Sequence, residues 1–484
     1  MTKKMFQISR VLMIILTIGV CLTLLLDGRV MILDKHIYTR CVLQILSLIM
    51  FLIISVLYEK KRKVFSTGYI FLMINVFING TICPCYYTNS RLIRDERENY
   101  YMPNDHFNLY MQVYFILMFL ILIYILCLKH TTEDIKRYDF IRYKDTDDFL
   151  IFIMALFVAF PIMKKTGING VMLMAPVLCY FFGRIIYTKY NLSQGIFCYL
   201  GLILGLYGIY RILDQRYLVI QYIMPIVLIF FVFVAVNDNY QKGKKVIPLM
   251  LSGIAAVLLY GMISEIIKLN RYWNGSYSLM RELTNWQSYI DFAGHQFYRI
   301  FGIWTELGGN IIDYARQNGY FYGITYVKFL APYLGFEYIS LPAISAKYIM
   351  ASYAQPGLLA EGYANFGIIG AVVNLLIPFV LAELFLDIFL KKRDGFSICL
   401  MTIPFVKVLL DGGTINSIIV GIGNCLLTFC LYLVMQYLKI NLKTIENIRI
   451  RFFLKPHYDS VKKDFEMTAD GENNGKNISN CTGI

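Results

Sequence analysis

The sequence predicts an all-α polytopic membrane protein with about twelve transmembrane helices and one large external loop before the last three spans. Of the 484 residues, 58% are hydrophobic and only 16% are charged, whereas soluble domains are nearer half apolar and a quarter charged. The apolar residues gather in runs of about twenty, which is the length that crosses a bilayer as a helix. Helices are also the form that satisfies the backbone in lipid.

The first run, "ISRVLMIILTIGVCLTLLL", is not followed by a small-residue cleavage site, so we interpret it as a retained span rather than a signal peptide. Nine spans are predicted within residues 1–267 and three within 366–438. Their approximate limits are 9–27, 39–58, 64–82, 108–128, 148–163, 169–187, 194–212, 216–235, 246–267, 366–389, 396–411 and 416–438.

Lys and Arg are concentrated in alternate flanks of these spans, as in "EKKRK", "QKGKK" and "KKRD". Because basic flanks stay on the cytoplasmic side, this bias predicts that both termini are cytoplasmic. The net charge of +14 then reflects a basic girdle facing anionic headgroups, and it requires no nucleic acid. We expect a bacterial cytoplasmic membrane protein whose residues 439–484 form a cytoplasmic amphipathic segment and a polar tail.

The long connection 268–365 is predicted to lie outside and to hold the active site. It is rich in aromatic residues, as in "YFYGITYVKFLAPYLGFEY", and long ordered loops are usually functional. A helical wheel over 291–306 places Asp291, His295, Arg299 and Glu306 opposite an apolar stripe. This set is either a group of site residues or the solvated face of an amphipathic helix.

Cations in and beside this loop suit an anionic lipid headgroup such as a diphosphate, because the planar fork of Arg pairs with two phosphate oxygens. The candidates are Arg271, Arg281, Arg299, Arg316 and Lys347. Nearby carboxylates offer a general base. Within the spans, Glu383 and Asp387 are expected to be merely interfacial, near the cytoplasmic end of the tenth span.

Known metal and nucleotide motifs are missing from the sequence, which has no HExxH, no CxxC pair, no Walker loop and no GxGxxG after a strand. We therefore expect neither a cofactor nor a metal.

The segment "PGLLAEGYANFGIIG" raises the question of why a carboxylate, Glu361, lies beside a long apolar run. This segment resembles the pattern of Wzy-type polymerases of bacterial polysaccharide repeat units, roughly P-G-x-x-x-E-x-Y-x-N-F-G-x-x-G. The matching residues are Pro356, Gly357, Glu361, Tyr363, Asn365, Phe366, Gly367 and Gly370. The likeness covers mainly 295–375, together with the layout of many spans and one large loop.

The resemblance implies a glycosyltransferase that polymerises undecaprenyl-diphosphate-linked oligosaccharides at the outer face of the membrane without a metal. It implies Glu361, Arg299, Arg316, His295 and Asp291 as catalytic candidates. Arg271, Arg281, Lys347, Tyr363 and Asn365 would bind substrate. The bilayer, a flippase and a chain-length regulator are the further expected partners.

Two other functions remain open from the sequence. A flippase or exporter of lipid-linked oligosaccharide can also have twelve spans, although it would need its charges inside the spans. A ligase of the same superfamily would share the architecture. Glu361 itself could orient a loop arginine, or it could be a carboxylate near a helix N-terminus, where the helix dipole stabilises negative charge.

Overall fold

The computed structural model describes residues 2–26, 36–85, 104–128, 151–153, 155–156, 174–187, 196–210, 225, 228, 303–326, 335, 338–348, 355–392, 395–411 and 413–437. Within these ranges the chain is helical and holds no strand. The helices are α1 (Thr2–Leu26), α3 (Ile37–Arg62), α4 (Thr67–Phe71), the π-helix η1 (Leu72–Ile82), α6 (Asn104–Cys127), α9 (Met174–Tyr187), α10 (Ile196–Tyr210), α15 (Ile303–Asn318), α17 (Leu341–Tyr348), α18 (Leu358–Lys392), α19 (Gly395–Asp411) and α20 (Ile415–Tyr437).

Five stretches of the described chain are long and apolar enough to cross a membrane: Lys3–Leu26, Ile37–Arg62, Thr67–Cys85, His106–Cys127 and Leu358–Lys391. Three shorter apolar helical stretches are Ile196–Gly205, Phe396–Val406 and Ile415–Leu431. The helical, membrane-type character expected from the sequence is therefore present. The predicted span 246–267, most of 148–163 and of 216–235, and the segment 439–484 lie outside the described residues.

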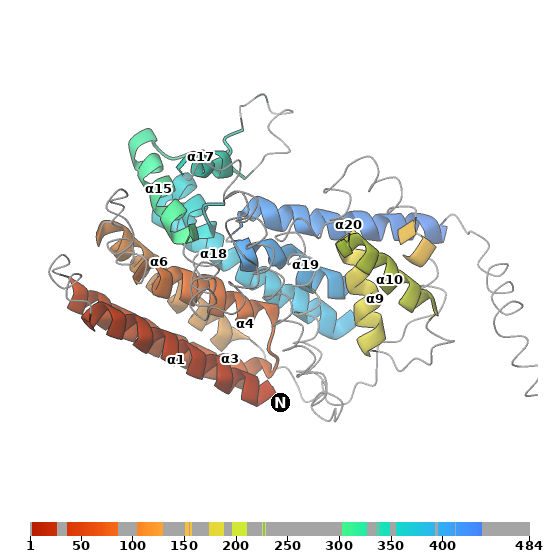
Figure 1. Cartoon of the computed structure of the whole chain (residues 1–484), viewed down its shortest axis with the longest axis horizontal. Helices are drawn as coiled ribbons and strands as arrows, with labels where there is room; N and C mark the ends of the chain where they lie inside the picture. Colours follow the sequence, from red (N-terminus) through yellow and green to blue (C-terminus); the bar gives the residue numbers. More distant parts are fainter. Residues whose placement is uncertain are drawn as a thin grey trace, which may run out of the picture.

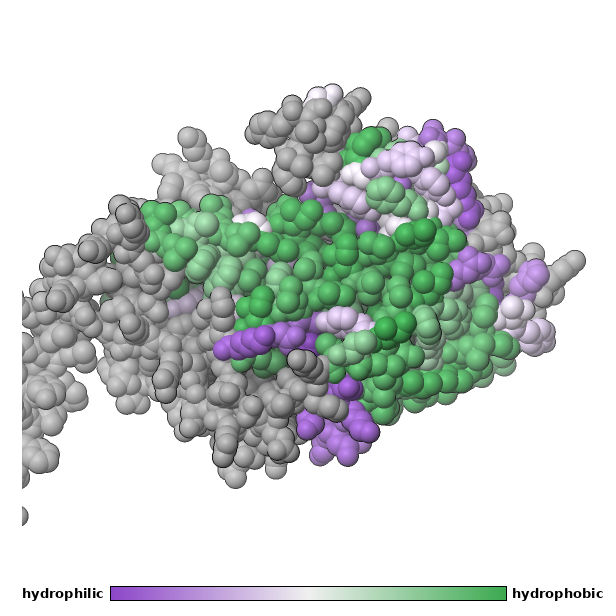
Figure 2. Space-filling model, turned by 180° about the vertical axis from the view of Figure 1, so that it is seen from behind, coloured by the Kyte–Doolittle hydropathy of each residue, from purple (hydrophilic) through white to green (hydrophobic). Residues whose placement is uncertain are grey.

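The helices lie in a bundle in which α1, α3 and α6 form one side and α9, α10, α19 and α20 the other, with α18 between them (Figure 1). Helices α15 and α17 lie together at one end of α18 (Figure 1). Large apolar side chains cover the outside of the bundle; on α1, for example, Ile8 is 66% exposed and Ile15 is 60% exposed. Figure 2 shows the resulting broad hydrophobic face, with hydrophilic residues along its margins. Such a surface suits lipid rather than water.

Helix α18 is two helices joined by a sharp turn at Phe366 (φ −143°, ψ 23°) and Gly367 (φ 66°, ψ −147°). We call residues 358–365 the short arm and residues 368–392 the long arm. The Asn374 side-chain amide donates a 3.1 Å hydrogen bond to the Leu358 carbonyl. Sixteen residues of straight helix would separate these positions by about 24 Å, so the two arms run antiparallel as a helical hairpin.

Two glycines allow the arms to touch. A Cβ atom added to Gly362 would collide with the carbonyl of Gly370, and one added to Gly370 would collide with the carbonyl of Gly362. The predicted boundary between the external loop and the tenth span, 365/366, falls at the turn between the arms. The motif that includes Glu361 therefore builds this hairpin, and the long arm alone is long enough to cross a bilayer.

Candidate functional site

The last turn of α15 presents a cation and a carboxylate together. Arg316 donates from Nε to the Tyr363 hydroxyl at 3.3 Å, and its guanidinium lies 5.9 Å from the centre of that ring. Asp313, one turn earlier, lies 3.8 Å from Arg316 Nη1. The Arg316 side chain is 39% exposed and that of Asp313 is 46% exposed, so both charged groups can meet a ligand. Stacking on an aromatic face also fixes the orientation of the guanidinium.

A buried histidine holds Asp313 from the other side. His106, near the start of α6, has its Nε2 atom 2.7 Å from Asp313 Oδ1, and its own side chain is 3% exposed. The contact joins residues 207 positions apart in the sequence. The carboxylate is thus fixed between an imidazole and a guanidinium while one side of it remains open. We call His106, Asp313, Arg316 and Tyr363 the outer cluster, after the external side on which the sequence predicts that the 268–365 segment lies.

The turn after α15 joins this helix to the short arm. The backbone N–H groups of Phe321 and Tyr322 donate to the carbonyls of Ala364 and Asn365 at 2.9 and 3.2 Å. The Asn365 side chain accepts from Gly323 N–H at 2.9 Å and donates to the Thr325 hydroxyl at 2.6 Å. The last carbonyls of the short arm therefore have partners, as a helix end away from water requires.

A tyrosine of the same turn ties it to the long arm. Tyr326 donates to the Asn374 side chain at 2.8 Å. Burial, together with the nearby Glu361 carboxylate, raises the pKa of Tyr326, so it stays a neutral donor at ordinary pH. The turn is therefore hydrogen-bonded to both arms of the hairpin, next to the outer cluster.

Glu361 lies in the short arm and is 1% exposed. Its Oε2 atom accepts a 2.7 Å hydrogen bond from the N–H of Ile415, the first residue of α20, and lies 3.4 Å from the Asn374 amide nitrogen. The carboxylate thus satisfies a free backbone donor at the positive end of another helix, where negative charge is favoured. This links the hairpin to α20.

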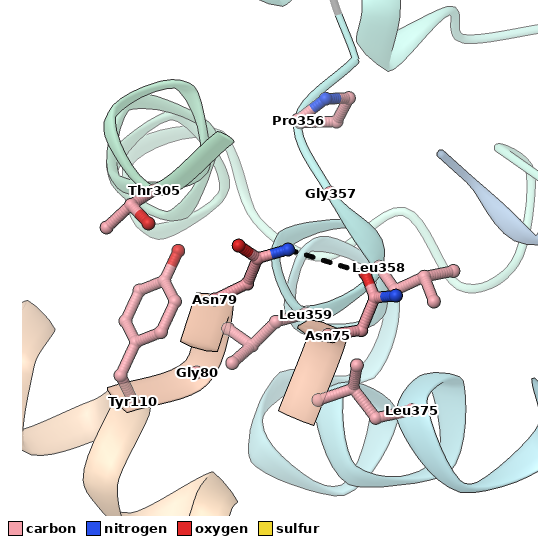
Figure 3. Close-up of a pocket in the computed structure, with 10 residues that line it drawn as sticks. All are labelled: Asn75, Asn79, Gly80, Tyr110, Thr305, Pro356, Gly357, Leu358, Leu359 and Leu375. Atoms are coloured by element: carbon pink, nitrogen blue, oxygen red, sulfur yellow. Dashed lines mark hydrogen bonds between the residues drawn. The ribbon is translucent and has the colours of Figure 1, made fainter. Parts of the chain in front are cut away.

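A small cavity lies at the start of the short arm, among η1, α6 and α15 (Figure 3). It is lined by Asn75, Asn79, Gly80, Tyr110, Thr305, Pro356, Gly357, Leu358, Leu359 and Leu375. None of these ten side chains is charged. Asn75 and Asn79 come from η1, and π-helical segments are frequent at functional sites.

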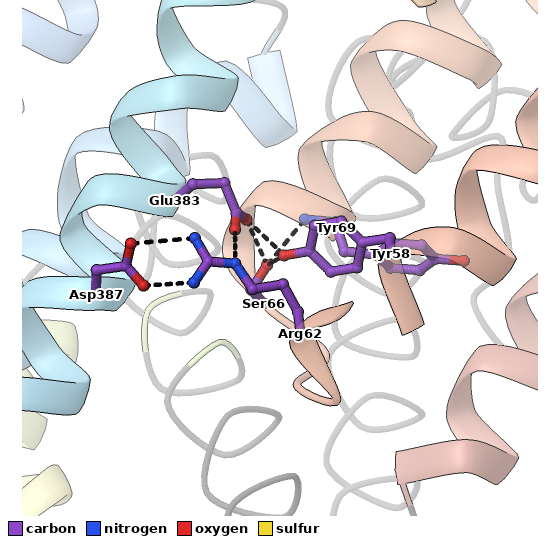
Figure 4. A network of polar contacts seen from close by, with 6 residues as sticks. All are labelled: Tyr58, Arg62, Ser66, Tyr69, Glu383 and Asp387. Carbon is purple, nitrogen blue, oxygen red and sulfur yellow. Dashed lines mark hydrogen bonds and ion pairs between the residues drawn. The ribbon is translucent and has the colours of Figure 1, made fainter. Parts of the chain in front are cut away.

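A second polar cluster joins the C-terminal end of α3 to the far end of the long arm (Figure 4). Arg62 pairs through Nε with Glu383 at 2.8 Å and through both terminal nitrogens with Asp387, at 2.5 and 3.1 Å. Tyr58 and Ser66 also donate to Glu383, at 2.5 and 3.1 Å. We call these five residues the buried ion cluster. Glu383 is completely buried within the bundle, so it is not an exposed side chain, and its interfacial depth in the membrane stays a prediction.

The structure brings some of the predicted site residues together, and others lie outside the described residues. Glu361, Tyr363 and Asn365 share the short arm, and Arg316 lies on Tyr363. Lys347 is in α17, which packs on α15, and Glu306 is in the first turn of α15. The candidates Arg271, Arg281, Asp291, His295 and Arg299 lie outside the described residues.

Sequence reasoning missed Asp313 and His106. The three-residue spacing of Asp313 and Arg316 on a helix was an available signal, because such residues share a face. Nothing local in the sequence placed His106 beside them. In the part of the chain that the structure describes, no three His, Cys, Asp or Glu side chains gather as metal ligands would.

Comparison with known proteins places the chain in a family that has no assigned function. Residues 1–482 match the family described as a family of unknown function (DUF6032), and the chain belongs to that family. No curated protein and no solved structure matches the chain.

Proposed function

We propose that the protein is a membrane glycosyltransferase that polymerises lipid-linked oligosaccharide repeat units at the outer face of the cytoplasmic membrane. The observation that carries the proposal is the outer cluster. It presents an exposed guanidinium and an exposed carboxylate together at one end of a lipid-exposed bundle. The resemblance of 356–370 to Wzy-type polymerases supports the same function, since this segment forms the hairpin beneath the cluster.

In this proposal Arg316 binds the diphosphate of the donor lipid. The bond between the anomeric carbon and the diphosphate oxygen breaks, and negative charge grows on the leaving diphosphate. A guanidinium held in place by Tyr363 stabilises that charge without reorganising, and electrostatic stabilisation of this kind is usually a large part of catalysis. The lipid diphosphate then leaves with both electrons of the broken bond.

Asp313 is the base that we assign among the described residues. It takes the proton from the acceptor hydroxyl as that oxygen bonds to the anomeric carbon. Its exposed side can reach a substrate, whereas the Glu361 carboxylate is buried and accepts from Ile415. Asp291 and His295 remain further candidates. Glu361 acts through the position of the hairpin.

Deletion of the gene in its host, followed by analysis of surface glycan, tests the function. A polymerase predicts the loss of long chains while single repeats are still displayed. Lipid-linked repeats trapped on the cytoplasmic side would instead indicate a flippase or exporter. Full-length glycan that accumulates on its lipid carrier would indicate a ligase. An unchanged glycan profile would refute all three.

A further inference from the structure

We propose that the cavity at the start of the short arm is a second phosphoryl-binding site, separate from Arg316. The volume of the cavity is about 30 Å³, which is room for about two water-sized atoms. It can therefore admit two oxygen atoms at the edge of a phosphoryl group, but it cannot admit a sugar or a whole nucleotide.

The direction of the short arm favours an anion in the cavity. Gly357 to Leu359, at its N-terminus, line the cavity. The first backbone N–H groups of a helix have no partners within the helix and carry partial positive charge, so they attract anions. Interrupted helices in membranes use such ends to bind anionic groups of their substrates. Here the sharp turn at Phe366–Gly367 and the Gly362–Gly370 contact hold this helix end deep beside the bundle.

Independently of the helix end, two buried donors that line the cavity lack partners among the described residues. Thr305 is 3% exposed and Asn75 is 6% exposed, and neither Thr305 Oγ1 nor Asn75 Nδ2 has a hydrogen-bond partner among the described residues. Figure 3 shows the Thr305 hydroxyl turned toward Tyr110 and Asn79 across the cavity. Buried polar groups without a partner are costly and few in native proteins. A bound oxyanion that accepts from the Thr305 hydroxyl removes this cost for that group.

The composition of the lining selects the class of ligand. Asn75, Thr305, Tyr110 and the backbone N–H groups of the short arm all offer donors, and no carboxylate lines the cavity. A divalent cation would need anionic oxygen ligands, so the donors and the positive helix end favour an oxyanion. The phosphoryl group could belong to a prenyl diphosphate or to free phosphate or pyrophosphate.

The distance from Arg316 makes this a separate site. Thr305 and Arg316 both lie on α15, eleven residues apart, which is about 16 Å along the axis. A single diphosphate cannot span that distance. The assignment of the second site to a second lipid-linked substrate rests on the proposed function, because polymerisation joins two such substrates. The binding of a phosphoryl group itself does not rest on it.

The test uses purified full-length protein that carries Arg316→Ala, so that the surface site does not contribute. Inorganic phosphate, pyrophosphate and farnesyl diphosphate are titrated, with farnesol as the uncharged control, and the thermal unfolding midpoint is recorded. At least one oxyanion should raise the midpoint. Adding Thr305→Val should weaken that ligand at least about ten-fold, since a hydrogen bond to a charged group is lost. Asn75→Asp should weaken it further through charge repulsion.

Thr17→Val is the matched control, because Thr17 is also buried on a helix with an unpartnered hydroxyl among the described residues but does not line the cavity. Its titration should equal that of the parent. Stabilisation by free phosphate or pyrophosphate would identify a free anion as the ligand, and stabilisation by farnesyl diphosphate alone would identify a lipid headgroup. No stabilisation by any of them, or equal stabilisation with and without Thr305→Val, would overturn the proposal. A protein that binds but does not polymerise would contradict only the proposed function.

Discussion

Asp313 and Glu361 are two carboxylates with different environments, and the proposed function gives them different roles. Asp313 is open on one side and is fixed by His106 and Arg316. Glu361 is buried against the first N–H of α20. The proposed base must reach the substrate, whereas a residue that positions the hairpin need only keep its acceptor oxygen.

We therefore predict opposite results for the two amide variants. Asp313→Asn should reduce polymerisation by about 10²- to 10⁴-fold, the usual contribution of a general base, with protein abundance unchanged. Glu361→Gln retains an oxygen that accepts from Ile415 N–H, so it should keep wild-type chain lengths and lower the unfolding free energy by only about 1 kcal/mol. Glycan length at matched membrane abundance distinguishes these outcomes. Loss of long chains in Glu361→Gln with normal ones in Asp313→Asn would reverse the assignment.

Arg62 is the one cation of the buried ion cluster and faces two carboxylates, Glu383 and Asp387. Arg62→Met should destabilise the protein by about 3–5 kcal/mol, because it leaves buried negative charge uncompensated. Arg10→Met is the control, since Arg10 pairs with a single carboxylate, Glu59, and both side chains keep some contact with solvent, at 17% and 20% exposure, so its loss should cost less. Thermal unfolding in detergent measures both changes. Equal losses in the two variants would show that the cluster is not a special source of stability.

At the scale of elements, the hairpin of α18 depends on the contact between Gly362 and Gly370. Gly362→Ala should force the arms apart, displace Tyr363 from Arg316, and lower both stability and polymer length. Gly423→Ala is the matched control, because nothing lies within 4 Å of a Cβ at that position on α20. It should be neutral or slightly stabilising, since Ala is the better helix former. A Gly362→Ala protein with wild-type unfolding and chain lengths would contradict the hairpin.

The sequence predicted the long helices better than it predicted the hairpin. The predicted spans 9–27, 39–58 and 108–128 coincide with α1, α3 and α6. An uninterrupted apolar run in lipid forms a helix, because the helix satisfies all of its backbone hydrogen bonds within the segment. The sequence predicts that the short arm is part of the external loop, because a segment of eight residues that contains Glu361 is too short and too polar to be predicted as a transmembrane span. Its structure comes from contacts with Asn374, Ile415 and the 319–326 turn, which are distant in sequence.

The candidate site was predictable to the same limited degree. Arg316 and Tyr363 could be predicted as site residues from their chemistry and from the motif. Their contact could not be predicted, because it depends on the packing of α15 on the short arm. His106 could not be predicted as a site residue, because its partner Asp313 is 207 residues away in the sequence and no local sequence pattern connects the two. Glu383 was expected to be merely interfacial from its position near a span end, and no local pattern in the sequence predicted its burial and its hydrogen bonds with Tyr58 and Ser66.

For the whole molecule, the distribution of Lys and Arg predicts that the outer cluster and the buried ion cluster lie on opposite sides of the membrane. Single cysteines in a background without native thiols test this orientation. A cysteine at Asn318, exposed at the end of α15, should react with an impermeant reagent in intact cells. One at Lys60, exposed near the end of α3, should react only after permeabilisation. The reverse labelling pattern would place the outer cluster on the cytoplasmic side of the membrane and would contradict the proposed reaction at the outer face.

The most direct measurement of the central claim is polymer formation by the purified protein in proteoliposomes supplied with undecaprenyl-diphosphate-linked repeat units. Wild-type protein should convert single repeats into a ladder of longer chains without nucleotide. Arg316→Lys should shorten or abolish the ladder although the charge is kept, because Lys cannot pair with two phosphate oxygens at once. Arg10→Lys should behave as wild type. Retention of single repeats by the wild-type protein, or an unchanged ladder in Arg316→Lys, would contradict the account.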